Sequence, residues 1–289
     1  MTRGIPAGEG GSHDGPTAPL LWAPEAGPRA AGSPEPAGSL PRPPARRRRR
    51  WLRRALIVVL AIALAGALAF AGLMLATPSV STAPLLAQAF DRAHGAAYPG
   101  PPVPERFAAA LVATEDHRFY SEPGFDPIAI GRVIAGRLTG KPDQGGATLY
   151  QQLAKMLYTP RGSGPGAQAE QIILGIKLDL TYSKTQILRL YADVAYFGHG
   201  YYGLAQASCG YFGVVPAGLT WPQAALLAGL MQAPATDNPV ADFTVARARE
   251  THVLGRLVAT GTLTQAQAAR AYRTPLHVFG GPGTGCAAR

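Results

Sequence analysis

Cysteine and charge are both scarce in this chain. Two of its 289 residues are Cys, and 15% are Asp, Glu, Lys or Arg. Two cysteines are too few for a framework of disulfides. Cys209 shares helical spacing with Ala205 and Phe212, so we expect it to be buried and inert, and a bond to Cys286 stays open. Strand patterns are scarce and no fixed-period repeat occurs, which indicates a mainly α fold.

Charge is missing altogether between Arg54 and Asp91. Within this gap, Ala55 to Ala76 is a 22-residue apolar run, long enough to cross a bilayer core at about 1.5 Å per residue. More than fifty residues precede the run, which favours an anchor over a cleaved signal peptide. Arginines on its N-terminal side predict a single-pass protein of the cytoplasmic membrane, with a cytoplasmic N-terminus and an extracytoplasmic C-terminal domain.

The first 54 residues differ in composition from the rest. Residues 1–45 hold 10 Pro and 8 Gly with few large apolar residues, and they are expected to be disordered. The basic run from Arg46 to Arg50 lies beside the apolar run, so it reflects membrane topology and does not indicate nucleic-acid binding. The expected organisation is a tail at 1–54, a transmembrane helix at 55–76, a stem at 77–103 and an extracytoplasmic domain at 104–289.

Helix start signals dominate the chain after the apolar run. Ser183 and Gln186 have the spacing of a capping box, and Thr220 followed by Pro222 marks another start. We expect helices over residues 85–92, 105–120, 126–138, 183–196, 220–231, 243–259 and 264–272.

Two stretches are expected to move or to touch lipid. Tyr158 to Gly166 is rich in Gly and Pro and predicts a mobile loop. Residues from Ile128 to Lys141 interleave apolar and basic side chains, which suits an anionic membrane surface. An ordinary surface helix with an apolar side would show the same pattern, so both interpretations stay open.

One acidic residue stands on an apolar helical stripe. Phe107, Leu111, Glu115 and Phe119 are four residues apart and would share one helix face. Burial disfavours the charged form of a carboxyl group and brings its pKa toward the range of a general acid or base. The alternative is a helix-end charge that reaches water. Asp126 is similarly either a site residue or the N-cap of the next helix.

Several motifs surround this Glu, and together they resemble the glycosyltransferase family 51 domain, the peptidoglycan polymerase module of class A penicillin-binding proteins and monofunctional transglycosylases. The resemblance covers about residues 104–239. The residues that match the first two motifs are Glu115-Asp116, Phe119, Gly124, Asp126, Gly146, Thr148, Gln151-Gln152-Leu153 and Lys155. Those that match the central helix and later loops are Tyr182-Ser183-Lys184, Ile187-Leu188, Tyr191, Tyr196-Phe197-Gly198, Tyr202-Gly203, Tyr211-Phe212-Gly213 and Asn238-Pro239.

This resemblance implies a monofunctional, extracytoplasmic enzyme on a lysozyme-like, mainly helical fold, which joins lipid II units into β-1,4 glycan strands. Glu115 would be the general base that takes a proton from the attacking sugar hydroxyl. Lys155 would stabilise the pyrophosphate leaving group, with Arg161 as a second cation. No Ser-x-x-Lys or Lys-Thr-Gly motif occurs, so a transpeptidase half is not expected.

The same resemblance implies the remaining contacts. Its partners would be lipid II, the growing glycan chain, the membrane and other cell-wall synthesis proteins, without nucleic acid. No cofactor is required; a divalent cation, Mg or Mn, would suit the pyrophosphate, although the sequence shows no dedicated ligand cluster. The candidate substrate-binding residues are Asp116, Phe119, Asp126, Thr148, Gln151, Gln152 and Arg161.

The chain departs from the family pattern at several positions. Glu122 stands where the first motif usually carries His, and Asp193 stands where Asn is usual. The third motif's Glu position falls on Gln171, with Glu170 one residue early, and such an offset turns a helical side chain by about 100°. Both are kept as candidate catalytic residues.

These departures leave a second hypothesis open, a catalytically impaired lipid II-binding scaffold of the cell-wall machinery. A third, a glycan-cleaving enzyme, is disfavoured by Lys155, because glycan cleavage has no use for a cation that binds pyrophosphate.

Overall fold

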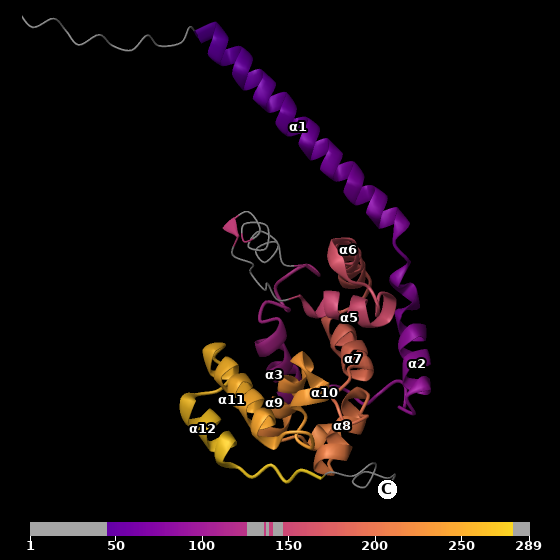
Figure 1. Cartoon of the computed structure of the whole chain (residues 1–289), viewed down its shortest axis with the longest axis vertical. Helices are drawn as coiled ribbons and strands as arrows, with labels where there is room; N and C mark the ends of the chain where they lie inside the picture. The colour runs from indigo at the N-terminus through magenta and orange to yellow at the C-terminus, as the bar shows by residue number, and fades with distance from the viewer. Residues whose placement is uncertain (1–44, 126–135, 137–138, 141–146, 280–289) are drawn as a thin grey trace, which may run out of the picture. The chain divides into compact units, whose positions relative to one another are not determined.

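The computed structural model describes residues 45–125, 136, 139–140 and 147–279. This part of the chain is helical and has no strand beyond one isolated bridge between Tyr196 and Tyr202 (Figure 1), so the predicted mainly α class is confirmed. Contacts divide the chain into two units, residues 1–58 and 59–289. The helices are α1 Ala45–Ala76, α2 Ala83–Ala93, α3 Glu105–Glu115, α5 Leu149–Tyr158, α6 Gly164–Thr181, α7 Lys184–Val194, α8 Gly203–Phe212, α9 Trp221–Gly229, α10 Pro234–Asp237, α11 Phe243–Ala259 and α12 Gln265–Arg273.

Local sequence signals explain where several helices begin. The Ser183 hydroxyl accepts the Gln186 N–H at 3.3 Å, and the Gln186 side-chain oxygen accepts the Ser183 N–H at 2.9 Å, which closes the expected capping box of α7. Thr220 and Gln223 form a second box at α9, and Asp242 accepts two backbone N–H groups at the start of α11. The helices expected over 85–92, 183–196, 220–231, 243–259 and 264–272 are confirmed, with ends shifted by a few residues.

Two groups of packed helices hold the core. Helices α3, α9 and α11 pack on one another, while α5 packs on α6 and α7, and α2 packs on α7. In Figure 1, α11 of the first group lies at the lower left of the packed helices and α6 of the second group lies at their top. Phe107 and Leu111 of α3, Leu153 of α5, Leu174 of α6 and Ile187 of α7 are fully buried, and each such side chain stabilises the fold by about 1.5–3 kcal/mol.

Helix α3 is shorter than the sequence predicts. It ends at Glu115 because Asp116 leaves the helical region, with φ −156° and ψ 72°, and its carboxylate accepts the backbone N–H of Leu149 at 3.0 Å. The expected extension to residue 120 is therefore wrong. Phe119 lies beyond the helix but is still fully buried, with its ring centroid 5.3 Å from that of Tyr150.

Residues 77–103, expected to form a stem, carry a helix that belongs to the packed core. Helix α2 packs on α7, and its Ala83, Ala87 and Asp91 are buried. Before α2, the Lys177 ammonium donates to the backbone oxygen of Thr77 at 2.8 Å. This segment is therefore tied to α6 and α7 as well as linking the apolar run to the helices that follow.

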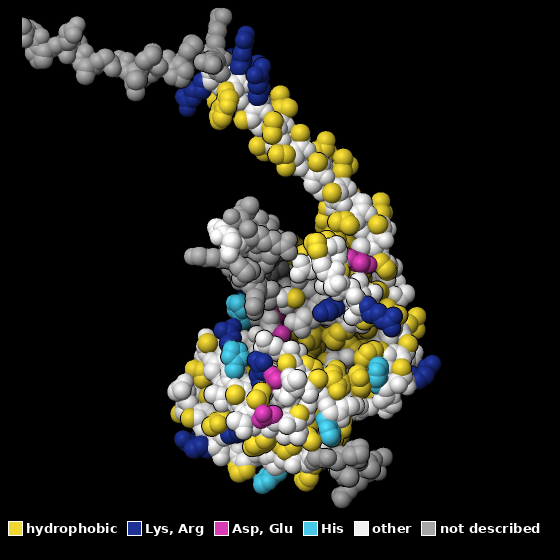
Figure 2. All heavy atoms as spheres, viewed as in Figure 1, with side chains coloured by type: hydrophobic (Ala, Val, Ile, Leu, Met, Phe, Trp, Pro, Cys, Tyr) yellow, Lys and Arg dark blue, Asp and Glu magenta, His cyan; other side chains and the backbone are white. Residues whose placement is uncertain are grey.

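Helix α1 carries the 22-residue apolar run. Among the described residues it is the one helix long and apolar enough to cross a membrane, and its most apolar stretch is entirely exposed. Figure 2 shows hydrophobic side chains along its length and Lys or Arg side chains at its N-terminal end. A stripe-free apolar surface of this kind is typical of a helix in lipid.

The Gly- and Pro-rich stretch at 158–166 is only partly a loop. Helix α5 ends at Tyr158 and α6 begins at Gly164, so residues 159–163 connect them. The expectation of a loop to residue 166 is wrong, because Pro165 is tolerated in the first turn of a helix, where its missing N–H has no helical partner.

Three other expectations concern the cysteines, the helix at 126–138 and the lipid-facing segment at 128–141. Cys209 of α8 is half-buried, not fully buried, and is disulfide-bonded. Cys286 lies outside the described residues. The expected helix at 126–138 also lies outside them except for residue 136, and the lipid-facing segment at 128–141 except for 136, 139 and 140.

Candidate active site

A cleft of about 500 Å³ opens at the C-terminal end of α3. It is framed by three side chains of the predicted site, Glu115, Gln152 and Lys155, and by residues of other segments. Most of its lining is apolar or aromatic, with a few polar groups, which is typical of a ligand site. The lining residues are Phe90, Glu115, Gln152, Lys155, Met156, Pro160, Tyr191, Val194, Ala195, Tyr196, Met231, Gln232 and Pro234.

Glu115 is held in the cleft by a side-chain amide. Gln152 donates its Nε2 to Glu115 Oε2 at 2.9 Å and to the backbone oxygen of Ala147 at 3.2 Å. Its Oε1 accepts the phenol hydroxyl of Tyr191 at 2.7 Å. Because each atom of the amide has its own partner, the Gln152 side chain has one orientation, and it presents a donor to Glu115.

Burial is the main influence on this carboxyl group. It raises the pKa of Glu115 above the ordinary value, and the neighbouring Asp116 charge acts in the same direction. The hydrogen bond from Gln152 and the charges of His252 and Arg249 lower that pKa and limit the shift. A raised pKa makes this carboxylate a stronger base than an exposed one.

Lys155 supplies the positive charge of the cleft wall. It lies on the last turn of α5, is exposed, and lines the cleft together with Glu115. Arg161 lies in the 159–163 connection and is exposed, but it is not among the lining residues, whereas its neighbour Pro160 is. The structure thus brings Glu115, Gln152 and Lys155 together and leaves Arg161 beside them.

Asp116 and Thr148 join the end of α3 to the start of α5. Asp116 is 7% exposed and accepts the first N–H of α5, that of Leu149. Thr148 is the N-cap residue of α5; its hydroxyl accepts the Gln151 N–H at 3.3 Å and donates to the Gly124 oxygen at 3.4 Å. These contacts fix the helix that carries Gln152 and Lys155 against the helix that ends in Glu115.

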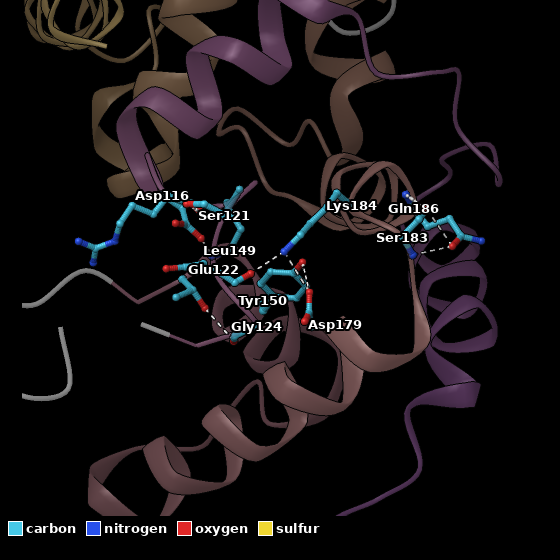
Figure 3. A network of polar contacts seen from close by, with 12 residues as sticks. Asp116, Ser121, Glu122, Gly124, Leu149, Tyr150, Asp179, Ser183, Lys184 and Gln186 are labelled. Atoms are coloured by element: carbon cyan, nitrogen blue, oxygen red, sulfur yellow. Dashed lines mark hydrogen bonds and ion pairs between the residues drawn. The ribbon is translucent and has the colours of Figure 1, made fainter. Parts of the chain in front are cut away.

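A polar network lies behind this junction (Figure 3). The Lys184 ammonium donates to the backbone oxygen of Glu122 at 2.7 Å and to Asp179 Oδ1 at 3.0 Å. The Tyr150 hydroxyl donates to the same Asp179 oxygen at 2.6 Å. Lys184 also lies 4.8 Å from the ring centroid of Tyr150 and 5.2 Å from that of Phe119, so one cation holds three helices and a loop.

Gly124 lies two residues after Glu122 in the same loop. Its φ is +62°, and a Cβ atom there would lie 2.6 Å from the Gly175 oxygen of α6. Only a residue without a side chain allows both the left-handed backbone and this close approach.

The remaining predicted residues lie away from the cleft. Gln171 on α6 donates its Nε2 to the Thr159 hydroxyl at 3.0 Å, so it fastens α6 to the 159–163 connection. Glu170, on the same helix, and Gln151 are half-buried and do not line the cleft. Phe119 belongs to the core. Asp126 lies outside the described residues.

Several lining and supporting residues escaped the sequence analysis. Phe90 reaches the cleft from α2, and Gln232 from the turn after α9. Arg249 donates to Gln232 Oε1 at 2.8 Å and to Asp237 Oδ2 at 2.6 Å, so it orients one wall. No local pattern signals these residues, because they come from distant segments. Glu122 had a signal, its departure from the motif.

The described residues offer no metal centre, since no group of three or more His, Cys, Asp or Glu side chains is gathered among them. The cleft lining contains one carboxylate, Glu115, which is already hydrogen-bonded. Divalent cations such as Mg²⁺ prefer several oxygen ligands, so these residues do not fit a resident cation.

Comparisons with known proteins agree on one family. The transglycosylase family model matches residues 85–258. A protein of Cupriavidus necator that is a transglycosylase by name is 34% identical over 176 residues, which cover 61% of this chain and 76% of that protein. Penicillin-binding protein 1A of Aquifex aeolicus is 39% identical over 61% of this chain, and that of Escherichia coli 36% over 57%.

The matched region is a small part of those larger relatives. The chain spans 24% of the Aquifex protein and 20% of the Escherichia protein. A crystal structure of penicillin-binding protein 1A from Haemophilus influenzae aligns with 61% of this chain and 17% of its own, at 22% identity and a TM-score of 0.36. The lysozyme-like fold stays a prediction.

Proposed function

This chain belongs to the transglycosylase family of glycosyltransferases, and from that premise we propose that it polymerises lipid II into β-1,4 glycan strands of peptidoglycan. The observation that carries the proposal is the cleft lined by a half-buried carboxyl group, Glu115, which accepts a hydrogen bond from the Gln152 amide, and by a cation, Lys155. Glycosyl transfer from a lipid pyrophosphate needs these two groups, a base for the attacking hydroxyl and a positive charge for the leaving group.

Glu115 is assigned the role of general base. An acceptor sugar hydroxyl gives its proton to the Glu115 carboxylate while its oxygen forms a bond to C1 of the donor sugar, and the bond from C1 to the pyrophosphate oxygen breaks. The raised pKa of Glu115 makes it a stronger base than an exposed carboxylate. Gln152, locked by Tyr191, keeps the carboxylate in one orientation as the proton arrives.

Lys155 is assigned the pyrophosphate. Charge develops on the leaving oxygens as the bond to C1 breaks, and an ammonium group already placed at the cleft wall stabilises that charge without the reorganisation that water requires. Arg161 sits in the connection that follows α5 and is exposed, so it is placed to reach the same phosphates from outside the lining.

The membrane helix gives the reaction its location. We propose that α1 crosses the cytoplasmic membrane once, with the Arg run inside and the cleft outside, where the lipid-linked substrate and the growing glycan chain are also held. Protease added to intact spheroplasts should digest the domain and spare the Arg-rich tail; the reverse pattern would contradict this topology.

The function is tested by polymerisation of fluorescent lipid II by the purified full chain in detergent, with products separated on a gel. We expect glycan chains from the wild type and a loss of about 10²–10⁴-fold with Glu115→Gln, because an amide cannot accept the proton. Glu105→Gln, an exposed site on the first turn of the same helix, is the matched control and should polymerise normally.

The same assay separates the scaffold hypothesis from the enzyme. Gln171 is hydrogen-bonded to Thr159 and lies outside the cleft lining, so the third motif supplies no acid there. If the wild type binds lipid II without turnover and Gln171→Glu restores turnover, the chain is a catalytically impaired scaffold and the polymerase hypothesis is wrong. Turnover by the wild type would show that the missing Glu is tolerated.

A further inference from the structure

Two buried carboxyl groups meet directly behind Glu115. Asp116 and Glu122 are each 7% exposed, and their side chains are hydrogen-bonded to each other. A hydrogen bond between two carboxyl groups needs a proton on one of them, because an ionised carboxylate only accepts. The pair therefore holds one proton and one negative charge, which is the arrangement of lowest cost for two acids taken out of water.

The surrounding donors show which acid keeps the proton. Asp116 accepts the Leu149 N–H at 3.0 Å, and this bond favours its charged form. Glu122 has no such help, since its Oε1 has no hydrogen-bond partner among the described residues, and the nearby Lys184 bonds to its backbone oxygen and not to its side chain. The proton therefore belongs to Glu122, which donates it to Asp116.

We propose that Glu122 is a positioning residue of the active site, a neutral carboxylic acid that holds the Asp116 carboxylate in place by donating its proton. The expected effect on turnover rests on the proposed function. The proton shared by the two buried acids does not depend on that function. Asp116 follows Glu115 in sequence and anchors α5, so the proton on Glu122 fixes both the base and the helix that bears Gln152 and Lys155.

The groups that face the pair leave this assignment intact. The Arg118 charge, within the loop, favours ionised Glu122, as does Lys184 of α7, while burial and the Asp116 charge oppose it more strongly and raise the pKa of Glu122 to about 7. His117, just after α3, favours the charged form of Asp116. Tyr150 of α5 and Asp179 of α6 lie next to the pair, and the charges of Asp179, Asp116 and Glu122 all raise the pKa of Tyr150.

The hydrogen bond between Glu122 and Asp116 should be lost as pH rises. Above pH 7, Glu122 loses its proton and two adjacent buried carboxylates repel each other, so the bond to Asp116 breaks and the α3 to α5 junction loosens. Glu115 acts in the opposite sense, because it must be ionised to accept a proton and is lost as a base at low pH. The pH profile should thus be bell-shaped, with Glu122 responsible for its alkaline side.

The test compares pH profiles of lipid II polymerisation between about pH 5 and about pH 9 for the full-length chain. Wild-type turnover should fall about tenfold on the alkaline side. Glu122→Gln should remove that fall, since its amide donates an N–H at every pH. Glu122→His should also remove it, because neutral imidazole still carries one N–H. Glu105→Gln, the matched exposed site, should keep the wild-type profile.

An activity-independent measurement covers the case of an inactive protein. The infrared difference between wild type and folded Glu122→Gln should contain a protonated carboxyl band that titrates near pH 7, because the bands of other acids with a similarly raised pKa, among them Asp91 and Glu250, occur in both proteins and cancel. Absence of that difference band, or superimposable pH profiles of wild type and Glu122→Gln, would overturn the inference. If no protein polymerises at any pH while the band behaves as expected, the proposed function fails and the shared proton stands.

Discussion

Two pairs of buried acids lie in this domain, and they are built differently. Asp116 and Glu122 are hydrogen-bonded to each other, and a backbone N–H supplies Asp116 with a further donor. The Asp193 charge of α7 acts on Asp91 of α2. Neither oxygen of Asp91, nor Oδ2 of Asp193, has a hydrogen-bond partner among the described residues, whereas the first pair leaves one such oxygen, Glu122 Oε1. We therefore refer to the first pair as the satisfied pair and to the second as the strained pair.

The difference shows that burial alone does not make a functional acid. Burial raises the pKa of Asp91 to about 7 and that of Asp193 to about 6, much as it does for Glu122. The donors, however, decide what each group can do, since a satisfied carboxylate holds a fixed position and an unsatisfied one costs stability. The Gly100 N–H and the Arg189 charge offset part of that cost at Asp193.

Removing the acceptor of the satisfied pair should have the largest effect. Asp116→Ala leaves the Leu149 N–H and the Glu122 acid without a partner, and we expect the free energy of unfolding to fall by about 2–4 kcal/mol. Chemical denaturation measures it. Asp242→Ala is a matched change at an exposed N-cap, with an expected loss of about 1 kcal/mol; equal losses would mean that burial of the pair adds nothing.

Removing one charge of the strained pair should stabilise the domain. Asp193→Asn removes the negative charge that raises the pKa of Asp91 and the cost of burying that charge, so the gain at pH 8 should be about 1–3 kcal/mol. Both acids have folded pKa values above the unfolded value of about 3.9, so their contribution to wild-type stability is greatest below pH 4 and declines up to pH 7.

The pH dependence provides the decisive comparison for this variant. Thermal unfolding of wild type and Asp193→Asn at pH 5 and pH 8 should give a larger difference at pH 8, because the wild type has by then lost the protons of both acids. A constant difference across pH would show that the two acids do not interact.

The smallest expected effect concerns the cation beside the strained pair. Arg189 donates to the Gly100 oxygen through Nε at 3.2 Å and Nη2 at 2.6 Å. Arg189→Lys keeps the charge and loses the two-fold contact, so the free energy of unfolding should fall by about 0.5–1 kcal/mol. A change in the pH dependence as well would mean that the guanidinium plane, and not its charge alone, offsets Asp193.

Local signals were enough to place most helices but not the site. The capping residues Ser183, Thr220 and Thr264 act on their own next turns, so their helices are predictable from neighbouring residues. The end of α3 is not, because it depends on a bond between Asp116 and Leu149, 33 residues later. The apolar periodicity continues to Phe119, so it predicted a helix that extends beyond the observed end at Glu115.

The site shows the same division. Glu115, Gln152 and Lys155 could be assigned from motifs and do meet in one cleft. Phe90 and Arg249 could not, since their roles depend on the packing of α2 and α11 around the cleft. The roles of Gln171 and Glu122 also required the structure. Gln171 bonds to Thr159 and so holds α6 to the 159–163 connection, and Glu122 pairs with Asp116.

Phe90 ties α2, the helix that follows the apolar run, to the cleft as well as to the core. Its side chain forms part of the cleft wall, and Ala83 and Ala87 of the same helix fill the core. A fragment cut at residue 104 would therefore expose apolar surface and lose one wall of the cleft. The Lys177 ammonium of α6 donates to the backbone oxygen of Thr77, so the contacts of the packed helices begin at the residue that follows the end of α1.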